Sequence, residues 1–111
     1  MIIIRKALAY SLIAIVAVGS AAPAFAEGYW NRTHPRRAEV NHRIANQERQ
    51  IRHDVRDGKL SRGQGRALMA QDRAVLADER ADARLDGGHI TRAEQRQLNG
   101  DLNAIHNEIP H

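Results

Sequence analysis

The chain has 111 residues, no cysteine, 4% aromatic residues and a formal net charge of +4 at neutral pH. Its length allows one small domain, and the lack of cysteine excludes disulfides and a lipid-modified cysteine anchor. Basic residues alternate with acidic ones instead of clustering, which argues against a nucleic-acid-binding protein.

The first 26 residues have the pattern of a secretory signal peptide. Arg5 and Lys6 precede an apolar run over 7–18, and Ala24-Phe25-Ala26 forms a small-residue cleavage site. The run is shorter than the ~20 apolar residues that span a bilayer. We therefore expect cleavage after Ala26, no membrane span in the cleaved protein, and a periplasmic or secreted location. Removal of residues 1–26 lowers the net charge to about +2.

Residues 27–35 are expected to form a flexible N-terminal arm, followed by a helical domain over 36–111. The arm contains Tyr29 and Trp30, the only aromatic residues after the cleavage site, among Gly, Asn and Pro. These side chains either fold back on the domain or contact a partner, and the sequence does not decide between the two.

Three amphipathic helices are predicted in the domain, over approximately 36–56, 62–86 and 92–109. The first and third each carry one apolar stripe at helical spacing. The stripes are Val40, Ile44, Ile51 and Val55, and Leu98, Leu102, Ile105 and Ile109. Pro110 stops the third helix.

The second helix is apolar on more than one face. Alanines at spacings of three and four form a seam that would let another helix approach closely, with Leu68 and Val75 beside it. The seam comprises Ala67, Ala70, Ala74, Ala77 and Ala81. A separate stripe repeats every seven residues, at Met69, Leu76 and Ala83. We expect this stripe to stay open to solvent and to bind a second copy or unfolded clients. The alternative is that the helix rotates and buries the stripe within one chain.

The connections between the helices share one pattern, a glycine turn followed by one aliphatic residue. Gly58 in the first turn, and Gly87 and Gly88 in the second, favour the positive φ that ends a helix. Leu60 and Ile90 follow these glycines and are expected to point inward.

Each turn leads into a helix start. Ser61 and Thr91 suit the N-cap position, because a hydroxyl oxygen accepts a hydrogen bond from the first helical turn. Gln64 and Glu94 stand three residues later and complete two capping boxes. Short turns favour antiparallel neighbours, so we predict an all-α fold, a slender up-down-up bundle or hairpin of three helices.

The turns also resemble degenerate EF-hand loops. Placing Gly58 and Gly88 at the loop glycine gives loops over 53–64 and 83–94. Glu94 then occupies the bidentate position, but most oxygen ligands of a calcium loop are missing. Calcium binding is thus an alternative, whereas the capping boxes account for the same residues without a metal or any other cofactor.

The six histidines do not form the closely spaced helical pair that zinc sites use. They are His34, His42, His53, His89, His106 and His111. We expect them to lie scattered on the surface. No catalytic residues are predicted, because the sequence offers no triad, phosphate loop or carboxylate pair.

A second resemblance concerns the segments Leu60-Ser61-Arg62-Gly63-Gln64 and Ile90-Thr91-Arg92-Ala93-Glu94. Both are similar to the repeated motif of LTxxQ-type periplasmic proteins, the Spy/CpxP group. Here Ser replaces Thr in the first copy, and Glu replaces Gln in the second. The resemblance implies a non-enzymatic, dimeric helical protein that holds unfolded clients on a concave surface.

These observations together predict an exported, non-enzymatic protein with a binding or chaperone-like role in the cell envelope. Its expected partners are a second copy of the chain or unfolded envelope proteins. The alternatives are a degenerate EF-hand-like calcium-binding protein and a structural or assembly factor.

Overall fold

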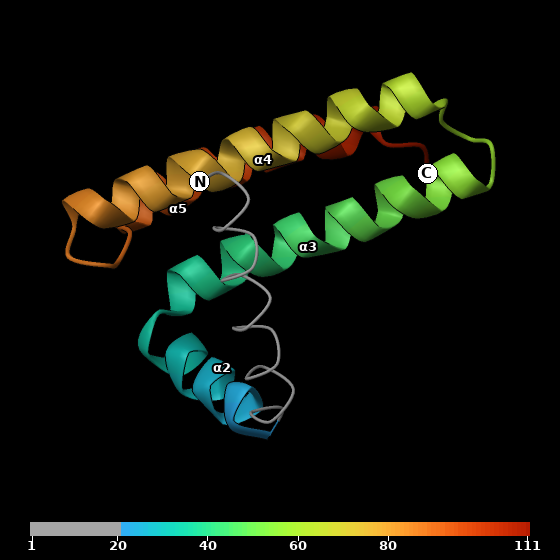
Figure 1. The fold of residues 1–111 in the computed structure, drawn as a ribbon. Helices are drawn as coiled ribbons and strands as arrows, with labels where there is room; N and C mark the ends of the chain where they lie inside the picture. Colours follow the sequence, from blue (N-terminus) through green and yellow to red (C-terminus); the bar gives the residue numbers. More distant parts are fainter. Residues whose placement is uncertain (1–20) are drawn as a thin grey trace, which may run out of the picture. The chain divides into compact units, whose positions relative to one another are not determined.

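The computed structural model describes the backbone of residues 21–111 and the side chains of residues 27–111. Most of the predicted signal peptide therefore lies outside the described residues. The described chain is helical throughout, apart from its turns (Figure 1). Its helices are α2 (Ala21–Thr33), α3 (Pro35–Arg56), α4 (Arg62–Leu85) and α5 (Arg92–Glu108). No helix in this described part is long and apolar enough to cross a membrane.

The chain divides into two units, one that ends at Thr33 and one from His34 to His111. The first contains α2, a fourth helix where three were predicted, and α2 covers most of the segment 27–35. Most of the segment predicted to be a flexible arm is thus helical in the structure. The hydroxyl of Thr33 bonds to the carbonyl oxygens of Tyr29 and Trp30, at 3.1 Å each, and so satisfies acceptors of the last turn. The helix ends before His34, since the proline that follows disfavours helical geometry there.

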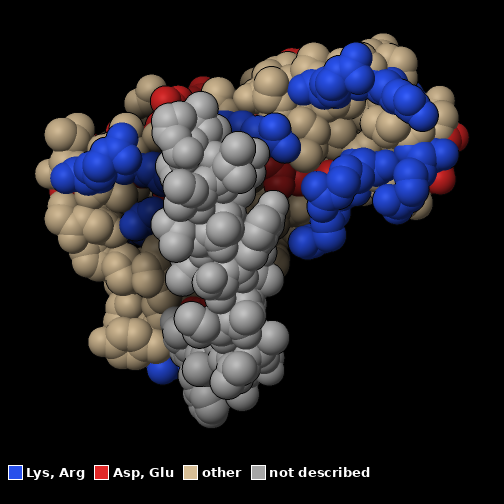
Figure 2. Space-filling view, in the orientation of Figure 1, with Lys and Arg blue, Asp and Glu red and all other residues tan. Residues whose placement is uncertain are grey.

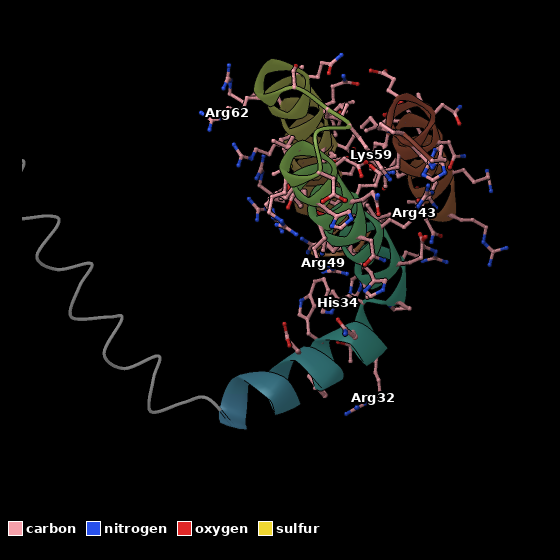
Figure 3. The ribbon with its side chains drawn as sticks, turned by 90° about the vertical axis from the view of Figure 1, so that its right-hand side faces the viewer. Arg32, His34, Arg43, Arg49, Lys59 and Arg62 are labelled. Carbon is pink, nitrogen blue, oxygen red and sulfur yellow. The ribbon has the colours of Figure 1, made fainter. Side chains whose placement is uncertain are left out.

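In the second unit, α3, α4 and α5 all contact one another, so they form a bundle and not an extended hairpin. Arg37 near the start of α3 pairs with Glu79 near the end of α4, which shows that these helices run antiparallel. α5 runs parallel to α3. Arg43 reaches from α3 to α5, where its guanidinium donates to the side-chain oxygens of Asn99 and Asn103 (Figure 3).

The buried residues of α3 and α5 largely follow the predicted stripes. Val40, Ile44 and Ile51 are buried, whereas Val55 is only half-buried. The whole α5 stripe is buried, as are the two aliphatic residues of the turns. These are Leu98, Leu102, Ile105 and Ile109, with Leu60 and Ile90.

The buried face of α4 differs from the one we predicted. Ala67, Ala70, Ala74 and Ala77 are exposed, so the expected alanine seam does not face another helix. The buried face instead comprises Gly65, Leu68, Asp72, Val75, Glu79 and Ala83. Alanine gains little from burial, whereas burial of the larger Leu68 and Val75 and the ion pair between Glu79 and Arg37 both favour the observed orientation of α4.

The two turns between the helices contain equivalent backbone hydrogen bonds, and each has a glycine with the positive φ that favours this residue. Gly58 and Gly87 have φ of 80° and 68°. The backbone N–H groups of Lys59 and Gly88 donate to carbonyls five residues earlier, at 2.8 and 2.7 Å. This bond defines a Schellman motif, which satisfies a carbonyl at the end of a helix. The second turn has one more residue before its N-cap, and Gly88 also has positive φ, 97°.

Both helices that follow the turns begin with a capping box. The backbone N–H of Gln64 donates to the Ser61 hydroxyl at 3.0 Å, and the Ser61 N–H donates to the Gln64 side chain at 2.7 Å. Thr91 and Glu94 make the equivalent bonds at 3.1 and 2.8 Å. Four backbone and side-chain groups at each start are thereby satisfied locally.

Replacing either cap should weaken the fold. Ser61→Ala and Thr91→Ala should each lower the free energy of unfolding by ~1 kcal/mol, because first-turn donors lose their acceptor. Thermal melts followed by circular dichroism measure this effect. Ser61→Asn and Thr91→Asn should retain most of the stability, and equal losses in the Ala and Asn variants would contradict the capping role.

Gly65 allows α3 and α4 to approach closely beside the first turn. A Cβ atom at this position would lie 2.5 Å from Cγ2 of Val55, well inside van der Waals contact. Gly63 and Gly100 are also helical, but a Cβ there meets nothing closer than 3.9 Å. Among the helical glycines that the structure describes, only Gly65 is therefore required by packing.

Gly65→Ala should lower the free energy of unfolding by ~1–3 kcal/mol, since the added methyl overpacks the contact with Val55. Gly63→Ala and Gly100→Ala serve as matched controls and should raise it by up to ~1 kcal/mol each, because alanine favours the helix. Urea unfolding measures all three. A stabilised Gly65→Ala protein would show that the helices can separate there without cost.

Candidate functional site

Three carboxylates lie inside the bundle, a feature that sequence analysis missed. Asp54, Asp72 and Glu79 are each 0% exposed. Glu79 forms an ion pair with Arg37 at 2.6 Å. Asp54 accepts a hydrogen bond from the side chain of Gln50 at 3.0 Å through one oxygen, and its other oxygen has no partner among the described residues.

Asp72 is the least satisfied of the three. Both of its carboxylate oxygens are buried without a hydrogen-bond partner in the described chain. Burial and, to a smaller extent, the nearby Glu48 carboxylate together raise the pKa of Asp72 from 3.8 to about 7. The protonated form of Asp72 is therefore well populated near neutral pH.

Asp72 should make the fold more stable in mild acid. The folded-state pKa of Asp72 is about 7, above the ordinary value of 3.8. Its contribution to the free energy of unfolding is therefore complete below pH 3.8 and is lost as the pH rises through 7. Asp72→Asn should remove this dependence and raise the free energy of unfolding at pH 8 by at least ~1 kcal/mol. Urea unfolding at pH 5 and pH 8 measures the difference.

Asp101→Asn provides the control for this prediction, because Asp101 lies exposed on α5. The free energy of unfolding of Asp101→Asn should change between pH 5 and pH 8 by as much as that of the parent protein. If the free energy of unfolding of Asp72→Asn shows the same change with pH as the parent protein, the carboxyl of Asp72 does not cause the pH dependence of stability.

Acidic side chains also gather at the turn between α4 and α5. A hydrogen bond with Glu94 raises the pKa of Asp86, and the backbone N–H of Thr91 lowers that of Glu94. Burial raises the pKa of Asp82, with a further contribution from Glu94. The described residues contain no group of three His, Asp or Glu side chains that could hold a metal ion. Glu94, the bidentate residue of the EF-hand alternative, is engaged in its capping box.

The structure brings four of the six histidines together in pairs. The rings of His34 and His89 stack with centroids 4.6 Å apart, and those of His106 and His111 lie tilted at 4.3 Å. The prediction of scattered histidines was thus wrong for these four. The first pair joins the N-cap of α3 to the second turn, so its separation in sequence concealed it, whereas the second joins α5 to the C-terminus.

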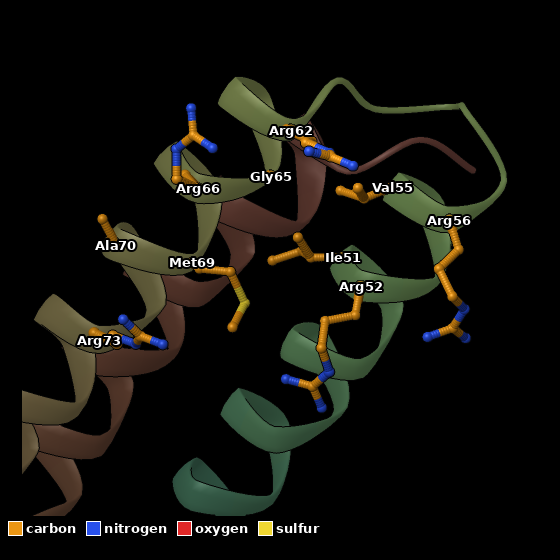
Figure 4. A pocket seen from close by; sticks show the side chains of 10 residues that line it. All are labelled: Ile51, Arg52, Val55, Arg56, Arg62, Gly65, Arg66, Met69, Ala70 and Arg73. Atoms are coloured by element: carbon orange, nitrogen blue, oxygen red, sulfur yellow. The ribbon is translucent and has the colours of Figure 1, made fainter.

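A groove lies between the C-terminal half of α3 and the N-terminal half of α4 (Figure 4). It has a volume of about 540 Å³. Ile51 and Val55 of α3 and Met69 of α4 lie between the two helices, with Gly65 and the exposed Ala70 completing an apolar floor. Val55 occupies the space that a side chain at position 65 would need.

Five arginines surround this floor, and we call the whole feature the arginine-lined groove. Arg52 and Arg56 come from α3, and Arg62, Arg66 and Arg73 come from α4. All five are exposed, and none makes an ion pair or hydrogen bond within the described part of the chain. Lys and Arg side chains gather over this end of the bundle in Figure 2. The groove therefore combines apolar surface with unneutralised positive charge.

The residues of the predicted partner surface lie elsewhere than expected. Ala83 is buried in the core, and Leu76 is half-buried against it. Met69 is also half-buried but lines the groove. The expectation of an open stripe was wrong, because Asp72 and Glu79 face inward and turn this side of α4 toward α3.

Sequence analysis did not single out the five groove arginines. A signal was present, since Arg52 and Arg56, and Arg62 and Arg66, each lie one helical turn apart. Alternation with acidic residues hid it. Of those acids, Asp54 and Asp72 are buried in the structure, and Asp57 pairs with His53 at 2.8 Å.

Comparison with known proteins leaves the chain without an assigned relative. No family model, curated protein or solved structure matches it. The chemistry of the groove is thus the guide to function. Guanidinium groups bind carboxylates and phosphates, and an apolar floor favours ligands that also bury hydrocarbon surface.

Proposed function

We propose that this protein is a non-enzymatic binding protein of the cell envelope that holds unfolded segments of other proteins in a chaperone-like manner. The binding surface is the arginine-lined groove. One observation supports this above all: the half-buried Val55 and Met69 and the exposed Ala70 leave apolar surface open to solvent between arginines that lack partners in the described chain.

The groove suits polypeptide ligands of varied sequence. Exposed apolar surface bordered by charge is typical of interaction sites, and the flexible Met69 side chain adapts its shape to different partners. Arginine adds hydrogen bonds to carboxylates and also packs against apolar and aromatic groups. The signal-peptide pattern of residues 1–26 and the resemblance of the two turns to LTxxQ-type proteins support an envelope location and a holding role.

Ala70→Glu tests this function with little risk to the fold. Ala70 is exposed on α4 and borders the groove, so glutamate there should keep the helix intact while it fills the floor and neutralises nearby arginines. We expect suppression of aggregation of a chemically denatured model protein, measured by light scattering, to fall at least about fivefold.

Ala77→Glu is the matched control. Ala77 is exposed on the same helix, two turns further on, and does not line the groove. It should retain holding activity. Equal activity in both variants and the parent protein would contradict the groove as the client site, and activity absent from the parent protein would contradict the holding function itself. A mass that doubles in the parent protein and not in Ala70→Glu would instead favour a second copy as the occupant.

A further inference from the structure

We propose that the preferred ligand of the arginine-lined groove is an acidic amphipathic helix. This inference rests on the proposed function and specifies its ligand. The helix would lie along the groove with its apolar side on the floor and its carboxylates against the arginines on both edges. It would thereby pack as a fourth helix beside α3 and α4.

The spacing of the arginines supports a helical ligand. Arg52 and Arg56 on one edge, and Arg62 and Arg66 on the other, are each separated by four residues. Four residues correspond to about 6 Å along a helix axis. Acidic residues four apart on a bound helix repeat at the same distance, so consecutive carboxylates meet consecutive guanidinium groups.

The extent of the groove also fits a helix. The α4 edge runs from Arg62 to Arg73, which corresponds to about 16 Å, or three turns of a helix. Its apolar floor is a narrow strip between two charged edges, and a helix with one apolar stripe flanked by acids has the complementary pattern. The single headgroup of a lipid would contact only part of this charge.

No carboxylate of the described chain forms an ion pair with the five groove arginines, although Glu48 lies one turn before Arg52 on α3. The nearest core carboxylate on α4, Asp72, points inward and is fully buried, and Asp57 is paired with His53. A bound carboxylate would thus meet arginines that need not break an existing ion pair. Because the arginines are exposed, salt should weaken the interaction strongly.

The test uses a fluorescent peptide of about 16 residues, with leucines on one helical face and glutamates on both flanks. Binding is measured by fluorescence anisotropy against the full cleaved chain. A peptide of identical composition, but scrambled to remove the helical pattern, and a version with lysine for glutamate serve as ligand controls. We expect the acidic helical peptide to bind at least about tenfold more tightly than either one.

Arg62→Glu/Arg66→Glu should weaken binding of this peptide at least about tenfold, and 0.5 M salt should do the same. Arg80→Glu/Arg84→Glu is the matched control. These arginines are exposed on α4 outside the groove, and the net charge changes equally. It should bind within about twofold of the parent protein, because exposed charges far from the ligand are largely screened. Equal losses in both double variants would overturn the proposal.

The outcomes also separate this inference from the proposed function. If Ala70→Glu loses client holding but the three peptides bind equally, the groove holds clients and the preference for an acidic helix is wrong. Binding to vesicles containing an anionic phospholipid, lost in Arg62→Glu/Arg66→Glu, together with no binding of the acidic peptide, would overturn the inference in favour of a lipid surface.

Discussion

The arrangement of the bundle depends on the buried ion pair between Arg37 and Glu79. Arg37 lies in the first turn of α3, where positive charge opposes the helix dipole. Its guanidinium also donates to the Gly88 carbonyl at 3.1 Å, so one side chain joins α3, α4 and the turn before α5. Glu79 is fully buried, and an unpaired carboxylate there would cost several kcal/mol. The rotation of α4 is therefore tied to the position of this arginine.

That rotation also determines what remains on the surface. With Glu79 and Asp72 turned inward, four alanines of α4 face solvent, and Met69 comes to lie beside Ile51 and Val55 in the groove. The four are Ala67, Ala70, Ala74 and Ala77. Arg62, Arg66 and Arg73 then line the same side as Arg52 and Arg56 of α3. The same orientation of α4 thus places the carboxylates in the core and the arginines along the groove on the surface.

Much of the fold follows from local sequence. The bounds of α3, α4 and α5 could be predicted to within one residue, because glycine turns, N-caps and prolines act on their immediate neighbours. The rotation of α4 about its own axis could not be predicted in this way, because it depends on the ion pair between Arg37 and Glu79, which are 42 residues apart in sequence. The apolar floor was only partly visible, as Met69 was identified but placed on an open stripe. Standard patterns put charged residues outside, which concealed both the buried acids and the groove.

The self-contained turns have a consequence for how the chain folds. Each turn closes with its own Schellman bond and capping box, and so needs no distant contact to form. Most packing then joins helices that are adjacent in sequence, which gives a low contact order and favours rapid folding. The ends of α3 and α4 that form the groove are joined by the first of these turns, so this helical hairpin is able to assemble before α5 docks.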